Sequence, residues 1–326
     1  MGALPRRLAE SAILFWIVLT LTFALLRAAP GDPAALLIAP GATAADVVRR
    51  RAELGLDAPL ALQYARWSGG ILKGDLGESF VQRRPVTTVL GEALPFSLAL
   101  GGASLLLTFA IGVAVGTLQA MRRGESLDIA LTIATTTLYS APSYWLALAL
   151  VALFTYGAAT WGFPAALRLP AFGVRDPAGE AVGLAALADV IRHATLPVLT
   201  LTAVGAAGVA RYARTIVADL VGLPWVRTAR AKGLGTRGIY LGHVIRNAWP
   251  PLVVLFALAL PGVLAGSVFV EVVFAWPGMG RVMLAAIGAR DYPVVMGAAT
   301  LYAALVILAN LAGDLALPLL DPRRRR

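Results

Sequence analysis

The sequence contains no cysteine, and among its 326 residues it has only two histidines and two lysines. The lack of cysteine excludes disulfide bonds, thiol nucleophiles and thiolate metal sites. The histidines, His193 and His243, lie far apart, and no carboxylates stand near them at a spacing typical of a metal centre. Neither Lys73 nor Lys232 stands in a GxxxxGK[ST] motif, so the chain has no P-loop. If ATP drives this protein, another subunit hydrolyses it.

Charged residues are also scarce, at 14% of the chain, whereas hydrophobic residues make up 59% and the mean hydropathy is +0.77. An ordinary soluble domain is less apolar, and runs of about twenty apolar residues indicate transmembrane helices. We therefore predict an all-α polytopic membrane protein. Its six expected spans cover residues 8–26, 94–121, 127–157, 195–221, 249–274 and 293–320.

The first span has two interpretations. It follows Arg6 and Arg7 and precedes Ala28-Ala29-Pro30, which is also the composition of a cleaved signal peptide. Composition alone leaves both an uncleaved helix and a signal peptide open.

Three regions follow from the change in hydropathy along the chain. Residues 1–28 form the N-terminal tail and first helix, and residues 94–326 form a membrane-spanning core. Between them, residues 29–93 are richer in Pro, Gly, Asp and Arg, yet Leu54, Tyr64 and Trp67 recur there. We expect this segment to fold outside the membrane with short helices.

Arginine and lysine define the expected orientation, because cytoplasmic loops of membrane proteins carry an excess of both. With the N-terminus inside, most of them fall on the cytoplasmic side, including Arg122, Arg123, the loop 222–247 and the final Arg323–Arg326. The prediction is that both termini are cytoplasmic. The arginine tail is then a topology anchor, which we favour over nucleic-acid binding.

Small residues in two spans predict close helix packing. Gly112 and Gly116 form a GxxxG motif, and Gly205 to Gly208 lie in the fourth span. Acids within spans indicate ion coupling when they lie mid-bilayer. Asp128, Glu271 and Asp314 instead fall near span ends, and Asn310 lies one turn from Asp314. We expect structural roles for them, which argues against a proton-driven secondary transporter.

The third span has a polar middle around a proline. Thr135, Tyr139, Ser140 and Ser143 surround Pro142, and a proline inside a span usually kinks the helix. Tyr139, Ser140, Pro142 and Ser143 are candidate lining residues of a translocation path. The hydroxyl groups are equally suited to donating hydrogen bonds to backbone carbonyls of their own helix.

The loop 222–247 is a basic island between two apolar spans. Pro224 suits the first turn of a helix over 224–232, and Gly233 is placed to end that helix in the left-handed conformation. A second helical segment is expected over 236–247. A short helix that is connected at both ends to membrane spans can transmit a displacement from a soluble partner to the helical bundle. The alternative is a basic loop lying on anionic headgroups.

At these residues the chain resembles a known family. The stretch WVRTARAKGLGTRGIYLGHVIRNAWPP, residues 225–251, resembles the cytoplasmic EAA loop of ABC-importer permeases, in the variant of dipeptide, oligopeptide and nickel importers. Further matches to the first, B-type permease of that family's pair span nearly the whole chain. They are PGDPA (30–34), LGLDAPLALQY (54–64), GDLGESF (74–80), EVVFAWPGMGR (271–281), RDYPVV (290–295) and NLAGDL with LDPR (310–323).

The resemblance implies a type I ABC-importer permease fold in a bacterial inner membrane, with an uncleaved first helix. It implies as partners a second, similar permease, two cytoplasmic ATPases that bind ATP and Mg²⁺, and an extracytoplasmic binding protein that docks near residues 29–93. This chain itself would carry no cofactor and bind no nucleic acid. The ATPase-coupling helix would comprise Arg227, Thr228, Ala229, Arg230, Ala231, Lys232, Gly233 and Leu234.

Two departures from the family pattern affect this helix. The Glu-Ala-Ala of the general motif is Arg227-Thr228-Ala229, so contacts of the acid do not carry over. The usual acidic–aromatic pair before the motif is Pro224-Trp225, which alters the start of the helix.

Two other functions are weighed against the importer permease. A self-sufficient secondary transporter or channel predicts internal repeats and buried ion-binding acids, which are not evident. A membrane-embedded enzyme would need a cysteine, a histidine pair or an acid dyad, and none is suitably placed. The substrate is left open between peptides, metal chelates, glutathione and sugars.

Overall fold

The computed structural model describes residues 3–30, 34, 43–177, 179, 182–265 and 268–320, and for 3, 4, 264, 265 and 314–320 it describes the backbone only. Within these ranges the chain is helical and contains no strand, apart from one isolated bridge between Glu78 and Pro85. The chain forms two compact units, one of Met1–Ser97 with Pro277–Leu308 and one of Leu98–Trp276 with Ala309–Arg326.

Six helices in the described residues are long and apolar enough to cross a membrane, which confirms the predicted number. They are Pro5–Ala28, Val86–Met121, Ser143–Thr160, Leu184–Val221, Gly238–Ala259 and Tyr292–Gly313. The expected bounds of the second and fourth spans were wrong at their starts. Both helices begin earlier than expected, at Val86 and Leu184, because each includes polar residues that precede its apolar stretch. These residues are 87, 88 and 92 in the second span and 189, 192 and 193 in the fourth.

The third and fifth spans are broken, which the sequence prediction of single helices missed. The helix α6 (Ser126–Ser140) ends before Pro142, and Ala141 is extended with ψ 130°. A new helix, α7 (Ser143–Val151), continues through a π-helix (Ala152–Gly157) into α8 (Ala158–Thr160). Proline here separates two helices instead of kinking one, because the residue before a proline is pushed out of the helical region.

The fifth predicted span contains three helices. These are α11 (Ile245–Ala259), α12 (Gly262–Ala265) and α13 (Val268–Val273). The first break falls at Leu260-Pro261-Gly262, where proline and glycine both disfavour a continuing helix. Two predictions lie outside the described side chains: the pairing of Asn310 with Asp314, and the arginine tail.

The first unit contains the N-terminal helices and the hairpin near the C-terminus. Its elements are α1 (Ala3–Ala28), α3 (Ala44–Glu53), α4 (Leu60–Ile71), the start of α5 (Val86–Met121), α14 (Met279–Gly288) and most of α15 (Tyr292–Leu320). Phe23 of α1 packs on Tyr64 and Trp67 of α4, with ring centroids 5.3 and 5.7 Å away. Within the described part of the expected segment 29–93, α3 and α4 are short helices as predicted, whereas residues 86–93 form the start of the long helix α5.

One side chain joins the loop before α5 to the turn before α15 in this unit. Asp291 is 2% exposed. Its carboxylate accepts hydrogen bonds from the hydroxyl of Ser79 and from the backbone N–H groups of Phe80 and Val81. Beside it, Val86 and Leu90 of α5 pack with Met279 of α14 and Val294 of α15 in a buried cluster.

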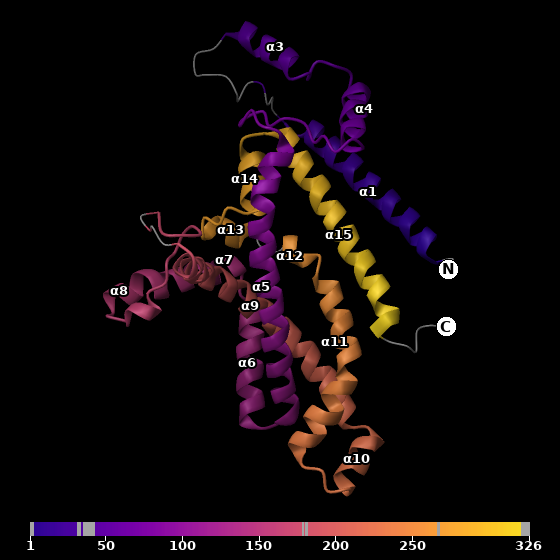
Figure 1. Cartoon of the computed structure of the whole chain (residues 1–326), viewed down its shortest axis with the longest axis vertical. Coiled ribbons are helices and arrows are strands. Elements are labelled where there is room, and N and C mark those ends of the chain that lie inside the picture. Colours follow the sequence, from indigo (N-terminus) through magenta and orange to yellow (C-terminus); the bar gives the residue numbers. More distant parts are fainter. Residues whose placement is uncertain are drawn as a thin grey trace. The chain divides into compact units, whose positions relative to one another are not determined.

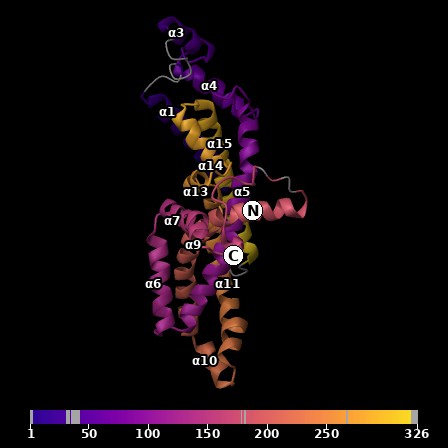
Figure 2. The same ribbon diagram turned by 90° about the vertical axis from the view of Figure 1, so that its left-hand side faces the viewer.

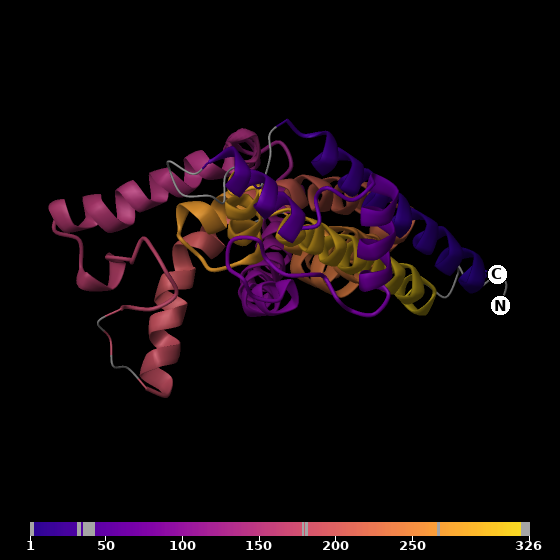
Figure 3. The ribbon, with the colours of Figure 1, turned by 90° about the horizontal axis from the view of Figure 1, so that it is seen from above.

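The second unit is a helical bundle. It comprises the rest of α5, α6, α7, α8, a 3-10 helix (Ala165–Leu167), α9 (Leu184–Val221), α10 (Pro224–Ala231), a π-helix (Gly238–Val244), α11, α12 and α13. The helices α6 and α9 lie side by side, and α10 lies beyond their lower ends (Figures 1 and 2). From above, α7 with α8 and the start of α9 diverge from one another (Figure 3).

Close contact of small residues joins α5 to α9. A Cβ atom at Gly112 would lie 2.7 Å from the Cβ of Val209, and one at Gly116 would lie 2.8 Å from the Cβ of Ala213. Real Cβ atoms essentially never come so close. The predicted packing role of the GxxxG motif is confirmed, because the two backbones approach only where a side chain is missing.

Candidate functional site

The helix α10 forms where the loop 222–247 was expected to be helical. Leu223 is extended, with φ −73° and ψ 149°, and Pro224 occupies the first turn, where its missing N–H costs no hydrogen bond. Gly233 has φ +79°, and its N–H donates to the carbonyl of Arg230, while Leu234 N–H donates to the carbonyl of Ala229. These two bonds form a Schellman motif, so the predicted left-handed end at Gly233 is confirmed.

One face of α10 is buried against the bundle. Val226 is 0% and Ala229 is 9% exposed, and Trp225 packs partly buried beside them. They share a cluster with buried residues of α9, the π-helix and α11, namely Ala213, Val217, Ile239, Tyr240, Val244, Ala248 and Leu252. The helix is therefore packed on both transmembrane helices to which the chain connects it.

The opposite face of α10 is exposed and basic. Of the predicted coupling residues, only Ala229 is buried, while Arg227, Thr228, Arg230, Ala231, Lys232, Gly233 and Leu234 are exposed. The sequence has no aspartate or glutamate between Asp219 and Glu271. The positive charge of this face therefore has no compensating acid in its own segment, which makes it suited to an acidic surface.

The chain after α10 is helical from residue 236 to Ala259, as a π-helix followed by α11. The second helical segment expected over 236–247 is therefore present. Pro250 and Pro251 both lie inside α11. π-helical turns are rare and are frequently found at functional sites, and here one links α10 to α11.

The predicted path residues gather at the break between α6 and α7. Tyr139, Ser140 and Pro142 are exposed and Ser143 is partly exposed. The guanidinium of Arg211 lies 5.0 Å from the Tyr139 ring centroid. Thr135 behaves differently, because it is buried and its hydroxyl bonds back to the carbonyl of Leu131. The self-bonding alternative therefore holds for Thr135.

An ion pair that was not predicted from the sequence joins α6 to α9. Arg214 of α9 donates from Nε to Asp128 Oδ1 at 2.9 Å and from Nη2 to Asp128 Oδ2 at 2.8 Å. The Asp128 carboxylate also accepts the Gly124 N–H at 3.0 Å. Asp128 was expected to have a structural role near a span end, but no partner was predicted for it. The residues lie 86 positions apart, and no local pattern in one sequence pairs them.

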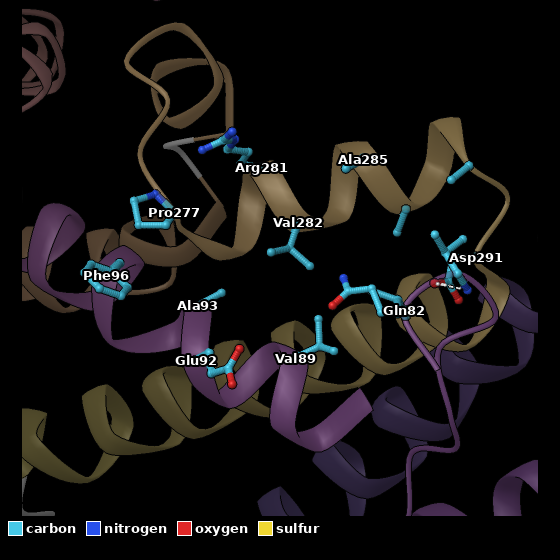
Figure 4. A pocket seen from close by; sticks show the side chains of 14 residues that line it. Gln82, Val89, Glu92, Ala93, Phe96, Pro277, Arg281, Val282, Ala285 and Asp291 are labelled. Atoms are coloured by element: carbon cyan, nitrogen blue, oxygen red, sulfur yellow. Dashed lines mark hydrogen bonds between the residues drawn. The ribbon is translucent and has the colours of Figure 1, made fainter. Parts of the chain in front are cut away.

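A cleft of about 420 Å³ lies in the first unit, between α5 and α14. Val282 and Ala285 of α14 face Val89 and Ala93 of α5, and Gln82 lies near its Asp291 end (Figure 4). Most of the residues that line the cleft are apolar; Arg281 and Glu92, which is ion-paired with Arg84, are also among them. None of the predicted site residues lines this cleft.

Comparison with known proteins identifies the family. Residues 112–326 match the family described as binding-protein-dependent transport system inner membrane component, and residues 2–101 match its N-terminal family. The chain is 33% identical over 319 residues to the oligopeptide transport system permease protein AppB of Bacillus subtilis, covering 98% of this chain and 97% of the relative.

Two further relatives come from Escherichia coli strain K12. The dipeptide transport system permease protein DppB is 32% identical over 333 residues, covering 98% of this chain and 97% of its own. The probable D,D-dipeptide transport system permease protein DdpB is 38% identical over 317 residues, covering 94% and 92%.

Among solved structures, an inward-facing form of the MetNI methionine ABC transporter is similar in fold. The TM-score is 0.54 at 20% identity, and the match covers 72% of this chain and 97% of that chain. The family is that of bacterial inner-membrane proteins with several spans, transport subunits whose ATP is hydrolysed by separate subunits. The solved structure agrees with this assignment in its fold. The chain belongs to the family of inner membrane components of binding-protein-dependent transport systems, as an ABC-importer permease.

Proposed function

We propose that this permease imports peptides or similar small solutes and that α10 is the element through which ATPases move it. The peptide assignment is supported by relatives named for oligopeptides, dipeptides and D,D-dipeptides, each of which the chain covers over at least 92% of its length. Nickel chelates, glutathione and sugars are the competing substrates. The family implies ATPase and binding-protein partners.

The assembly we propose contains this chain, a second homologous permease, two cytoplasmic ATPases and one extracytoplasmic binding protein, embedded in membrane lipid. ATP and Mg²⁺ bind to the ATPases. Both termini and α10 lie on the cytoplasmic side, and residues 29–93 lie outside, near the binding protein. Tyr139, Ser140, Pro142 and Ser143 line this chain's half of the path.

One observation carries the coupling proposal: α10 has one face buried on the bundle and one exposed basic face. Val226 and Ala229 fasten it to α9 and α11, so a displacement of α10 acts on both helices. Arg227 and Arg230 point outward with no acid nearby in the sequence. Such a helix is anchored on one side and open to an acidic groove on the other.

In this mechanism, ATP-driven closure of the two ATPases displaces α10, and α9 and α11 follow because their buried cluster holds them to it. The path then opens outward, and substrate enters from the binding protein. Hydrolysis resets the inward-facing state. The permease itself contributes only a change of conformation, since transport follows from shifting the equilibrium between its inward-facing and outward-open states.

The test is charge reversal on the exposed face. Arg230→Glu should weaken binding to the acidic groove about tenfold and reduce transport per ATP hydrolysed, measured in proteoliposomes with the complete transporter. Arg123→Glu is the matched control, because Arg123 is an exposed arginine outside α10, in the turn before α6. Its transport should stay close to that of the unmodified protein.

Equal transport and ATPase rates for Arg230→Glu and the unmodified complex would contradict the coupling role. A loss in both variants would point to general charge or topology effects, and would favour the alternative of a basic loop on anionic lipid. Dependence on anionic lipid separates these cases, because a headgroup-bound loop responds to lipid charge and a protein-bound helix does not.

A further inference from the structure

The Asp128–Arg214 ion pair joins three elements at one point. Asp128 lies in the first turn of α6 and is 3% exposed. Its two oxygens accept both guanidinium bonds from α9, and Oδ2 also accepts the N–H of Gly124 in the turn that follows α5. One carboxylate thus holds α9, the start of α6 and the 122–125 turn.

This junction lies close to the start of α10. Arg214 is about two turns before the end of α9 at Val221, and only Gly222 and Leu223 separate α9 from α10. Ala213 and Val217, which flank Arg214 on α9, belong to the buried cluster with Val226 of α10. A displacement of α10 therefore reaches Arg214 through a packed segment.

Near this end, the ion pair adds a charged contact to the packing of α6 along α9. The α5–α9 contact is one of small residues against backbone, with Gly116 facing Ala213. On α6, the apolar side chains of Leu127, Ile129 and Ile133 are exposed, whereas the carboxylate of Asp128 is buried. Further along α6, the ring of Tyr139 lies 3.3 Å from where a Cβ of Gly208 would stand.

We propose that Asp128 and Arg214 are positioning residues that make α6 and the 122–125 turn move together with α10. This rests on the proposed coupling role of α10. A bidentate arginine–carboxylate pair fixes both distance and orientation, which an apolar contact or a lysine cannot do. The ion pair thereby carries motion to α6, the helix that holds Tyr139 and Ser140.

The test measures distances between spin labels in the assembled transporter, which is simple in this permease because it has no cysteine of its own. One pair of labels is placed at Arg123 and Thr236, both exposed, in the turn and after α10. A second pair at Thr215 and Thr236 reports α9 against the segment after α10. With the Asp128–Arg214 pair intact, ATP should leave both distances unchanged.

In Asp128→Asn and in Arg214→Lys, ATP should change the 123–236 distance and leave the 215–236 distance unchanged. Transport per ATP hydrolysed should fall about tenfold. Glu125→Gln is the matched control, because Glu125 is an exposed acid three residues earlier whose carboxylate forms an ion pair with Arg122 at 3.0 Å. It should behave like the unmodified permease.

Two results would overturn the proposal. One is an ATP-induced change of the 123–236 distance in the permease with an intact ion pair. This measurement does not depend on whether the Asp128 and Arg214 variants fold. The other is an unchanged distance in both variants. The spin label at Thr236 distinguishes failure of the positioning role from failure of the coupling role. If adding the ATPases does not immobilise this label, α10 does not contact the ATPases and the coupling role is wrong. If the label is immobilised but the measured distances differ from those expected above, only the positioning role of Asp128 and Arg214 is wrong.

Discussion

The hydroxyl of Ser79 donates a 2.5 Å hydrogen bond to Asp291 Oδ2, although the two residues are 212 positions apart. The same carboxylate accepts the N–H of Phe80 at 3.0 Å and the N–H of Val81 at 3.3 Å. Asp291 itself precedes α15, and its own N–H donates to the carbonyl of Ala286. A single buried acid thus fixes the loop before α5 to the turn between α14 and α15.

Replacing this acid should destabilise the first unit. Asp291→Asn keeps the size of the side chain but leaves one acceptor oxygen for three donors, so buried N–H groups lose partners at a cost of about 2 kcal/mol. The thermal unfolding midpoint in detergent should fall by several degrees. Asp57→Asn is the control, because that acid is 50% exposed in its pair with Arg51 and should cost below about 1 kcal/mol. Equal midpoints for both variants would contradict the role of Asp291.

The glycine contact between α5 and α9 predicts different effects of two similar substitutions on the stability of the protein. In Gly116→Ala, the new methyl would lie 2.8 Å from Ala213 Cβ and 2.9 Å from the Arg214 nitrogen, so overpacking should cost about 2 kcal/mol. In Gly102→Ala, on the same helix, nothing lies within 4 Å, and the better helix former should be neutral or stabilising. Thermal unfolding of both variants checks this. A stabilised Gly116→Ala protein would show that the helices are not in contact there.

The features predicted well from sequence are those encoded locally. Pro224 and Gly233 define the start and end of α10 through their own backbone preferences, and both acted as expected. The six spans followed from hydropathy, since the bilayer selects for apolar length. Family resemblance added the peptide-permease assignment, which the physical chemistry of one sequence does not contain.

The features that were missed depend on tertiary contacts or on how a helix responds to proline. Pro142 separates two helices, whereas Pro197 lies inside the continuous helix α9, and the same residue type gives both outcomes. The pairs Asp128–Arg214 and Ser79–Asp291 are created by folding, since their members lie 86 and 212 positions apart. No periodicity or spacing in a single sequence identifies such partners.

The end of α10 offers a test confined to backbone geometry. Gly233 has φ +79° with nothing within 4 Å of an added Cβ, so Gly233→Ala introduces conformational strain of about 1 kcal/mol without a clash. Amide hydrogen exchange at residues 233 and 234 should accelerate about fivefold, because the Schellman bonds open more often. Gly235→Ala is the matched control, with equal space and no positive φ. Identical exchange in the two variants would mean that the left-handed end does not hold the helix.

The break between α6 and α7 is where the proposed path can be tested by chemistry. Because the chain has no cysteine, Ser140→Cys and Ser143→Cys introduce single thiols at the predicted path. If they line a water-filled route, a charged, membrane-impermeant maleimide should label both, and transported peptide should protect them. Ala147→Cys is the control on the same segment, since Ala147 is 0% exposed and packs with Val151 and Leu196. It should stay unlabelled with or without peptide. Labelling of Ser140→Cys and Ser143→Cys only by an apolar maleimide would place this face in lipid, and the path would then have to lie elsewhere in the bundle.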